Sequence, residues 1–226
     1  MKIKSTIAGV VLALVAGVAH AGPEVMNFAG LQANGEYVNN YYDGGSGGSY
    51  NGGSVDSGGQ NYGVVWVGAL AGGAPNGLWG NTANEPTGPN TMGFLSSSSA
   101  YMNVASGFTT GFSFYYSAHN TPGAIQVYSG LNGTGNLLAS LNLAVNGKNP
   151  NFSQGFSNWT PIGVSFAGTA RSADFSGTAN QIVFNDVTLN SSVPLTSNVP
   201  EPSSLALLGI GVVGLGLFRL KRQSRA

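Results

Sequence analysis

Side chains that could act as general bases are scarce in this chain of 226 residues, although serine hydroxyl groups are plentiful. The chain has no cysteine, which excludes thiol catalysis and thiolate metal sites. His119 is the only histidine after the first 21 residues, and its His-Asn-Thr-Pro-Gly stretch is typical of a turn between two strands. Residues 44–48 match the string Gly-x-Ser-x-Gly, but they lack the preceding strand and the following helix of a nucleophile elbow. The sequence therefore predicts no Ser-His-Asp triad.

Carboxylates are the other groups that could do acid–base work. A glycosidase needs two of them, roughly 5–9.5 Å apart in a cleft. Nothing in the spacing of the acidic residues pairs any two of them, so a secreted glycan-active hydrolase is the alternative rather than the leading function. Between residues 22 and 198 the acidic residues are Glu24, Glu36, Asp43, Asp56, Glu85, Asp174 and Asp186.

The same oxygen-bearing side chains could bind a hard cation. Calcium takes about six to eight oxygen ligands, many of which can be backbone carbonyls. The candidate ligands are Asp174, Asn185 and Asp186, with Asp43 and Asp56 as further carboxylates. The absence of an Asp-x-Asp-x-Asp-Gly loop excludes an EF-hand. Structural calcium is thus the one candidate cofactor, against the simpler interpretation that these are solvated turn residues.

Aromatic side chains could stack on sugar rings, with Asn and Asp supplying hydrogen bonds. Trp66 lies in an apolar run and is expected in the core. Trp79 lies in a loop rich in proline and glycine and is expected to be exposed. The aromatic candidates are Trp79, Tyr101, Tyr115, Tyr116 and Trp159. Of these, Trp79, Tyr115 and Trp159 are predicted to bind a ligand.

Short β-patterned segments must position these residues. The clearest pair is 124–128 and 137–143, which alternate apolar and polar residues around a Gly/Asn-rich turn and predict a hairpin. The glycine/serine tract 43–59 is expected to be an exposed loop, and 71–89 a second loop. The other predicted strands are 25–28, 36–38, 62–70, 92–95, 101–105, 111–116, 159–166, 172–175 and 181–189.

Residues 22–198 show no convincing apolar stripe of helical period. Many short strands separated by glycine-rich turns predict an all-β fold, an antiparallel β-sandwich or jelly roll. Two basic residues against seven acidic ones give this region a net charge of −5. Nucleic-acid binding is excluded, because neutralising phosphates needs clustered Lys and Arg.

Both ends of the chain have the composition of targeting segments. Residues 1–21 combine a basic start, an apolar stretch and an Ala19-His20-Ala21 cleavage site, which predicts a signal peptide and a mature start at Gly22. The expected partners there are the Sec translocon and signal peptidase. The exported domain is then 22–198.

The C-terminal segment 199–226 contains an uncharged run, Leu205–Phe218, followed by basic residues. Its 14 residues would span about 21 Å as a helix. Flanking residues extend the apolar helix to about 203–220, toward the roughly 30 Å of the hydrocarbon core. The positive-inside rule places the basic tail, 219–226, in the cytoplasm. The orienting residues are Arg219, Lys221, Arg222 and Arg225.

The order Pro200-Glu201-Pro202, short apolar helix and basic end resembles the PEP-CTERM sorting signal of Gram-negative bacteria. The resemblance covers about the last 28 residues. It implies export across the inner membrane, transient membrane anchoring, processing near the tripeptide by an exosortase, and a final place at the cell surface or outside the cell.

The exported region also resembles a recurring type of PEP-CTERM passenger. The matching stretches are 37–45, 61–64, 107–116, 127–135 and 183–189. The layout is similar to that of carbohydrate-binding jelly rolls, whose last strand often carries an Asp beside a structural calcium. Asp186 stands at that place, while Asn185, Asn27 and Ala29 replace residues that are frequently acidic there. The resemblance implies a role in binding extracellular polysaccharide or in matrix structure, rather than in catalysis.

Overall fold

Most of the longer strands form where β-branched and aromatic residues alternate with polar ones, and strands account for nearly all the regular structure. The computed structural model describes residues 22–73 and 75–196, where the one helical element is a 3-10 turn, η1 (Tyr41–Asp43). Every named strand pair in these ranges is antiparallel. The predicted all-β, antiparallel class is confirmed.

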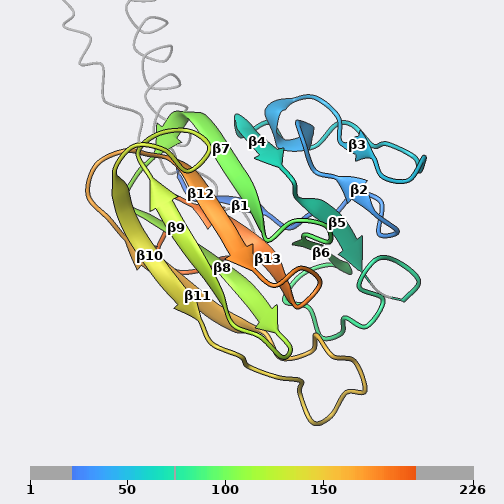
Figure 1. The fold of residues 1–226 in the computed structure, drawn as a ribbon. Helices are drawn as coiled ribbons and strands as arrows, with labels where there is room; N and C mark the ends of the chain where they lie inside the picture. The colour runs from blue at the N-terminus through green and yellow to red at the C-terminus, as the bar shows by residue number, and fades with distance from the viewer. Residues whose placement is uncertain (1–21, 74, 197–226) are drawn as a thin grey trace, which may run out of the picture. The chain divides into compact units, whose positions relative to one another are not determined.

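The strands form two sheets, labelled in Figure 1. The eight-stranded sheet has the order β11 (Thr160–Ser165), β8 (Gly111–Ala118), β13 (Ile182–Leu189), β6 (Asn90–Gly93), β5 (Leu70–Gly73), β2 (Glu36–Tyr37) and β3 (Gly48–Ser49), with β1 (Glu24–Met26) also paired to β13. The five-stranded sheet has the order β10 (Leu137–Leu143), β9 (Gly123–Tyr128), β12 (Ala170–Gly177), β7 (Ser99–Phe108) and β4 (Val64–Val67).

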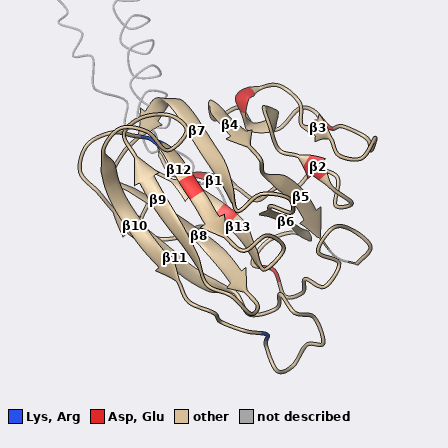
Figure 2. Ribbon diagram, in the orientation of Figure 1, with Lys and Arg blue, Asp and Glu red and all other residues tan. Residues whose placement is uncertain are grey.

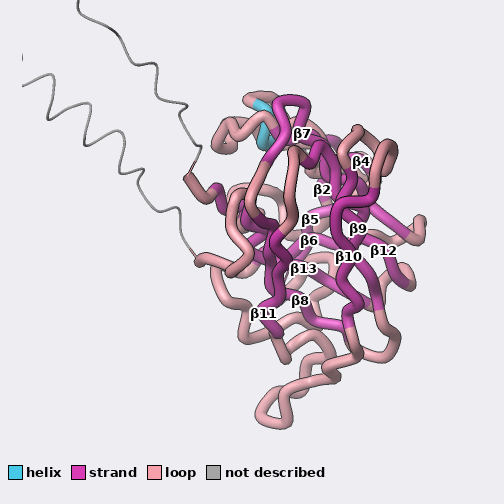
Figure 3. The backbone as a smooth tube through the Cα atoms, turned by 90° about the vertical axis from the view of Figure 1, so that its left-hand side faces the viewer, coloured by secondary structure: helices cyan, strands magenta, loops and turns pink. Residues whose placement is uncertain are grey.

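The two sheets pack against each other through aromatic rings, and Figure 3 shows the two layers from the side. Phe175 of β12 meets Phe112 of β8 and Phe184 of β13, with ring centroids 5.7 Å and 4.9 Å apart. Such edge-to-face pairs add about 0.5–1.5 kcal/mol each beyond the buried area. Trp66, 1% exposed, joins this core as predicted. The arrangement is that of a β-sandwich.

The predicted hairpin is present. Strands β9 and β10 pair in the register Ser140–Gln126 and Leu141–Ile125, around the turn that follows Tyr128. His119 lies in the connection between β8 and β9, so the predicted turn there is also confirmed.

The expected loop 71–89 begins too early, because residues 71–73 belong to β5, whereas its end agrees with the start of β6 at Asn90. The chain leaves β4 in one sheet, turns at Gly68, whose φ is +77°, and enters β5 in the other sheet. Strand β5 then pairs with β6 over residues 70–73 and 90–93. Sequence patterning reads 62–70 as one strand, because an apolar run gives no sign of the change of sheet.

The glycine/serine tract is mostly exposed, as expected, but part of it joins the sheet. Gly48 and Ser49 form edge strand β3 against β2, and an isolated bridge joins Ser46 to Ser57. An edge position tolerates glycine because it needs few side-chain contacts.

Candidate functional site

A loop spanning residues 83–87 crosses the outer face of the eight-stranded sheet. At one end, Trp159 Nε1 donates to the carbonyl oxygen of Ala83 over 3.0 Å. At the other end, Asn185 Nδ2 donates to the carbonyl oxygen of Thr87 over 2.9 Å. The loop therefore bridges from the start of β11 to β13, the two strands on either side of β8.

Tyr115 and Trp159 lie on this same outer face. On β8, Phe114 and Tyr116 point into the core, so the alternation of strand side chains turns Tyr115 outward. Tyr115 is directly opposite Pro161 on β11 and Asn185 on β13. Trp159 comes two residues before Pro161, and both aromatic residues are half-buried. The structure thus brings two of the three predicted ligand-binding aromatics to one face.

Glu85, in the middle of the loop, was not among the predicted site residues. Its side chain is half-buried, and its Oε1 atom is enclosed without a hydrogen-bond partner in the described part of the chain. An enclosed carboxylate oxygen without a donor costs free energy. A ligand hydroxyl is one group that could supply that donor. The Glu-Pro pair in a proline-rich loop gave no sign that this oxygen would be enclosed.

Asp186 lies beneath the same loop and is fully buried. Thr87 Oγ1 donates a short hydrogen bond to Asp186 Oδ1, whereas Oδ2 is buried with no partner among the described residues. Asn185 Oδ1 accepts from the Asp186 backbone N–H over 2.7 Å. The φ of Asp186 is +48°, at a register shift in β13. This local bulge turns the carboxylate out of the normal strand alternation.

Burial determines the charge state of this carboxyl group. Removal from water raises the pKa of Asp186 to about 6, and the hydrogen bond from Thr87 opposes the rise only in part. Near pH 6 the carboxyl group therefore exists in both its protonated and its charged form, and a cation could balance the charged form.

Asp186 and Asn185 lie together, but the third predicted metal ligand does not join them. Asp174 is on β12 in the five-stranded sheet, and its neighbours Ala173 and Phe175 point into the core. Its side chain therefore points away from the eight-stranded sheet, and one cation cannot contact both aspartates. Within residues 22–73 and 75–196, no group of three or more His, Asp or Glu side chains is placed to hold a metal.

The donor set around Asp186 fits a cation only partly. The orphaned, buried Oδ2 atom is the kind of oxygen that calcium binds, and Asn185 lies beside it. Most of the remaining ligands would have to be neutral oxygens, because the described residues place no group of three or more His, Asp or Glu side chains together.

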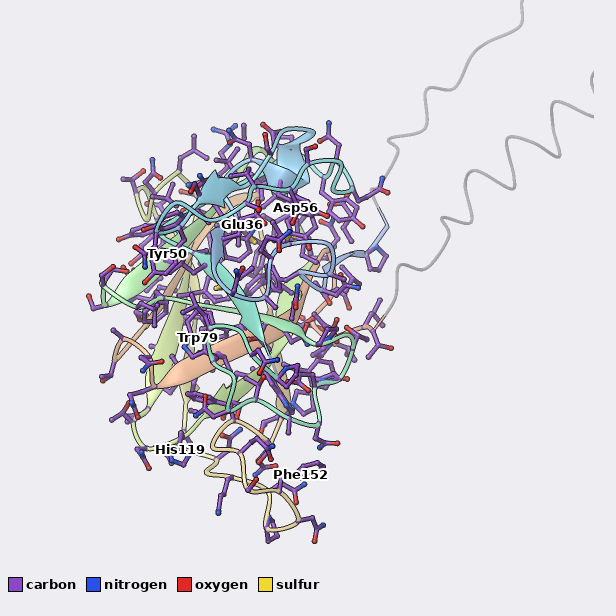
Figure 4. The ribbon with its side chains drawn as sticks, turned by 90° about the vertical axis from the view of Figure 1, so that its right-hand side faces the viewer. Glu36, Tyr50, Asp56, Trp79, His119 and Phe152 are labelled. Carbon is purple, nitrogen blue, oxygen red and sulfur yellow. The ribbon has the colours of Figure 1, made fainter. Side chains whose placement is uncertain are left out.

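The expected exposure of Trp79 is wrong. The indole is 5% exposed and belongs to a second cluster with Leu70, Phe156 and Val183. The glycines of β5 and β6 make room for it, since a Cβ atom at Gly93 would lie 2.7 Å from Trp79 Cζ2. Figure 4 labels Trp79 on this side of the molecule. A buried ring is not available to stack on a sugar.

Glu36 is a buried carboxylate that sequence patterning missed. It is fully buried, and its two oxygens accept from the backbone N–H groups of Gln32 over 2.9 Å and Asp56 over 2.6 Å. Gln32 Nε2 in turn donates to Asp56 Oδ2 over 2.6 Å. Burial, and to a lesser degree the charge of Asp56, raises the pKa of Glu36. Figure 4 labels both carboxylates. Because Glu36 is enclosed and accepts from two backbone N–H groups, it ties the segment at Gln32 to the segment at Asp56.

His119 has a structural environment. Its Nδ1 atom is 3.1 Å from the carbonyl oxygen of Gly155, and its ring packs edge-on to Phe156 with centroids 6.0 Å apart. His119 is thereby held against the segment that contains Gly155 and Phe156. Charged residues are few and scattered over the described region, as Figure 2 shows.

The targeting segments lie outside the described residues, apart from Gly22. This applies to Ala19 and Ala21, to Pro200, Glu201 and Pro202, and to the basic residues 219–225. Within the described ranges, no helix has the length and apolar character needed to cross a membrane.

A family model that matches the chain covers part of its C-terminal segment. Residues 198–222 match the family model described as the PEP-CTERM protein-sorting motif. The chain therefore carries a PEP-CTERM sorting motif, as predicted from Pro200-Glu201-Pro202 and the basic end. This motif implies export, transient anchoring through the C-terminal region and exosortase processing. No curated protein matches the chain.

Solved structures match parts of the chain at low identity, each with a TM-score below 0.5. The K2 cleaved adhesin domain of Lys-gingipain is 11% identical, with a TM-score of 0.47 over 75% of this chain and 100% of that one. The carbohydrate-binding module CBM6cm-2 of Cellvibrio mixtus lichenase 5A is 12% identical, with a TM-score of 0.35 over 49% of this chain and 83% of that one. A Bacillus subtilis arabinoxylan arabinofuranohydrolase is 18% identical, with a TM-score of 0.36 over 49% of this chain. The match spans only 23% of that hydrolase.

Proposed function

We propose that the β-sandwich of this exported protein binds extracellular polysaccharide, through the outer face that carries Tyr115 and Trp159. The observation that supports this is the placement of two half-exposed aromatic rings on the face that is crossed by a loop bearing the unpartnered Glu85 carboxylate. Aromatic rings stack on the apolar faces of sugar rings, and a carboxylate accepts hydrogen bonds from their hydroxyl groups.

The cellular setting is part of the same proposal. The signal peptide would direct the chain through the Sec translocon of a Gram-negative inner membrane, where signal peptidase would cleave after Ala21. The basic tail would stay in the cytoplasm until an exosortase releases the domain to the cell surface or the matrix. A purely structural matrix role without saccharide affinity is the competing outcome of the binding test.

The test is binding of the full-length chain, in detergent, to a panel of insoluble and soluble polysaccharides. Tyr115→Ala and Glu85→Gln should each weaken binding by about tenfold, the loss of one stacking or hydrogen-bonding contact. Tyr50→Ala is the matched control, because Tyr50 is a half-buried tyrosine just after the edge strand β3. Equal binding by Tyr115→Ala and wild type would contradict this site. Release of shortened glycans would favour the hydrolase instead.

We also propose that a calcium ion binds at Asp186, with Asn185 beside it. The support is the buried Oδ2 atom that has no partner in the described residues. Adding calcium after chelation should raise the melting temperature of the wild-type chain but not that of Asp186→Asn. Asp174→Asn, on the other sheet, should keep the full response. An unchanged melting temperature in the wild type would rule out the site.

A further inference from the structure

The outer face of the five-stranded sheet carries a second row of polar and aromatic side chains. Ala173 and Phe175 of β12 point into the core, so Asp174 between them points outward. Across the sheet, Asp174 is opposite Gln126 on β9 and Tyr101 on β7. All three outward side chains are half-buried.

The hairpin loop between β9 and β10 folds over one end of this row. Its Asn132 exchanges two hydrogen bonds with Asn103 of β7, of 2.7 Å and 2.9 Å. The N–H of Gly133 donates to Ser172 Oγ on β12 over 3.0 Å. The loop is therefore fixed to the two neighbouring strands rather than free in solvent.

Two tyrosine rings flank β12 next to this loop. A Cβ atom at Gly133 would lie 3.0 Å from Tyr101 Cε1 and 3.8 Å from Tyr128 Cε2, so both rings approach the same point from opposite sides. Tyr128 also donates from its hydroxyl group to Gln126 Oε1 over 2.9 Å. Asp174 thus lies between Tyr101 on one side and the Gln126–Tyr128 pair on the other.

The chemistry of this row favours a neutral, hydroxyl-rich ligand. Asp174 Oδ1 is enclosed without a hydrogen-bond partner in the described residues, and burial raises the pKa of this carboxyl group. The Tyr128 hydroxyl group engages the Oε1 atom of Gln126, and the amide nitrogen of this side chain can donate to a ligand. The cation of the same strand, Arg171, lies three residues away at a register shift. A negatively charged ligand would meet the carboxylate, whereas a sugar could donate to it and stack on the rings.

We propose that this face, formed by Tyr101, Gln126, Tyr128 and Asp174, is a second binding surface for neutral polysaccharide. It lies on the opposite side of the sandwich from Tyr115 and Trp159, so one molecule can bridge two glycan chains. The bridging role rests on the function proposed above for the Tyr115 face, while the second surface stands on its own residues. With one site on each face, a single molecule can cross-link a soluble polymer, and this cross-linking is measured as precipitation.

The experiment compares the full-length chain with face-specific variants, using a soluble neutral glucan and, separately, polygalacturonate. Wild type should bind the glucan and precipitate it, with weak binding to the charged polymer. The double variant Tyr101→Ala/Tyr128→Ala and the milder Gln126→Ala should lose precipitation. Gln126→Ala should keep the wild-type melting temperature, which separates a binding effect from unfolding.

The outcomes distinguish the two proposals. If the variants of the second face bind and precipitate like wild type while Tyr115→Ala does not, the second surface is refuted and the first stands. If Tyr115→Ala behaves like wild type and the Gln126→Ala variant loses glucan binding, the first proposal fails and the second surface stands. Preference for polygalacturonate, or dimerisation through this face in place of glucan binding, would overturn the second surface.

Discussion

At the scale of single residues, Asp186 shows how a local backbone feature changes chemistry. A normal strand would give Asp186 an alternating position, but its positive φ and the neighbouring register shift place the carboxyl group in an enclosed site under Thr87. Nothing local in the sequence marks this bulge. The role of Asp186 therefore depends on backbone geometry as much as on residue type.

The raised pKa of Asp186 predicts a pH dependence of stability. In the folded state the Asp186 carboxyl group holds its proton up to about pH 6, whereas in the unfolded chain it releases the proton at about pH 3.9. In chelator, the free energy of unfolding should therefore rise as the pH falls from about 6.5 to 4. Glu36 and Asp174, whose pKa values burial also raises, act with the same sign.

Asp186→Asn should reduce the difference in unfolding free energy between pH 4.5 and pH 7.5 by about 1–3 kcal/mol, because the titrating group is removed. Urea unfolding at pH 4.5 and pH 7.5 measures it. Asp43→Asn, an exposed carboxylate, is the control and should leave the slope unchanged. An identical pH dependence in Asp186→Asn and wild type would show that this carboxyl group titrates normally.

At the scale of elements, the make-up of each sheet and the burial of Trp79 depend on where the chain passes from one sheet to the other. Gly68 lets the chain pass from β4 to β5, and this passage gives the eight-stranded sheet its β5–β6 pair. That pair is also the surface on which Trp79 packs, because Gly72 and Gly93 leave room for the indole. The burial of Trp79 thus follows from glycines in two strands that local patterning did not predict.

Gly68→Ala should destabilise the fold by about 1–2 kcal/mol, the cost of a side chain in the left-handed region. The nearest atom to an added Cβ would be the carbonyl oxygen of Ser99 at 3.4 Å, so the cost is conformational rather than a clash. Gly68→Asn is the matched control and should cost less, since Asn tolerates this conformation. Chemical denaturation measures both, and equal stability of Gly68→Ala and wild type would contradict the argument.

At the scale of the whole molecule, the C-terminal sorting motif and the β-sandwich have separate tasks. The motif at residues 198–222 is a substrate for another protein, whereas the sandwich carries the surfaces proposed to bind glycans. Their separation along the chain means that a change in one should leave the other intact.

Replacing Pro200, Glu201 and Pro202 with alanine should leave the protein unprocessed and retained in the membrane fraction. Cell fractionation followed by immunoblotting measures this, with Ser203→Ala/Ser204→Ala as the control next to the motif. The retained protein should still bind the glucan after extraction in detergent. Normal release of the triple variant would show that the tripeptide is not needed for processing.

The sequence by itself determined what depends on local pattern. Short alternating segments predicted the all-β class and the β9–β10 hairpin, because the period of two is a property of neighbouring residues. The tripeptide, apolar run and basic end predicted the sorting motif, because that signal is read along the chain rather than in a fold.

Only the tertiary structure decided which residues share a surface. It placed Tyr115 and Trp159 on one face, buried Trp79, and put Asp174 and Asp186 on different sheets. It also brought Glu36 to Asp56, twenty residues apart, and Tyr101 to Tyr128 across β12. The physical reason is that the residues on each face depend on strand order and register. A one-residue change in the pairing of a strand would move all its side chains to the opposite face.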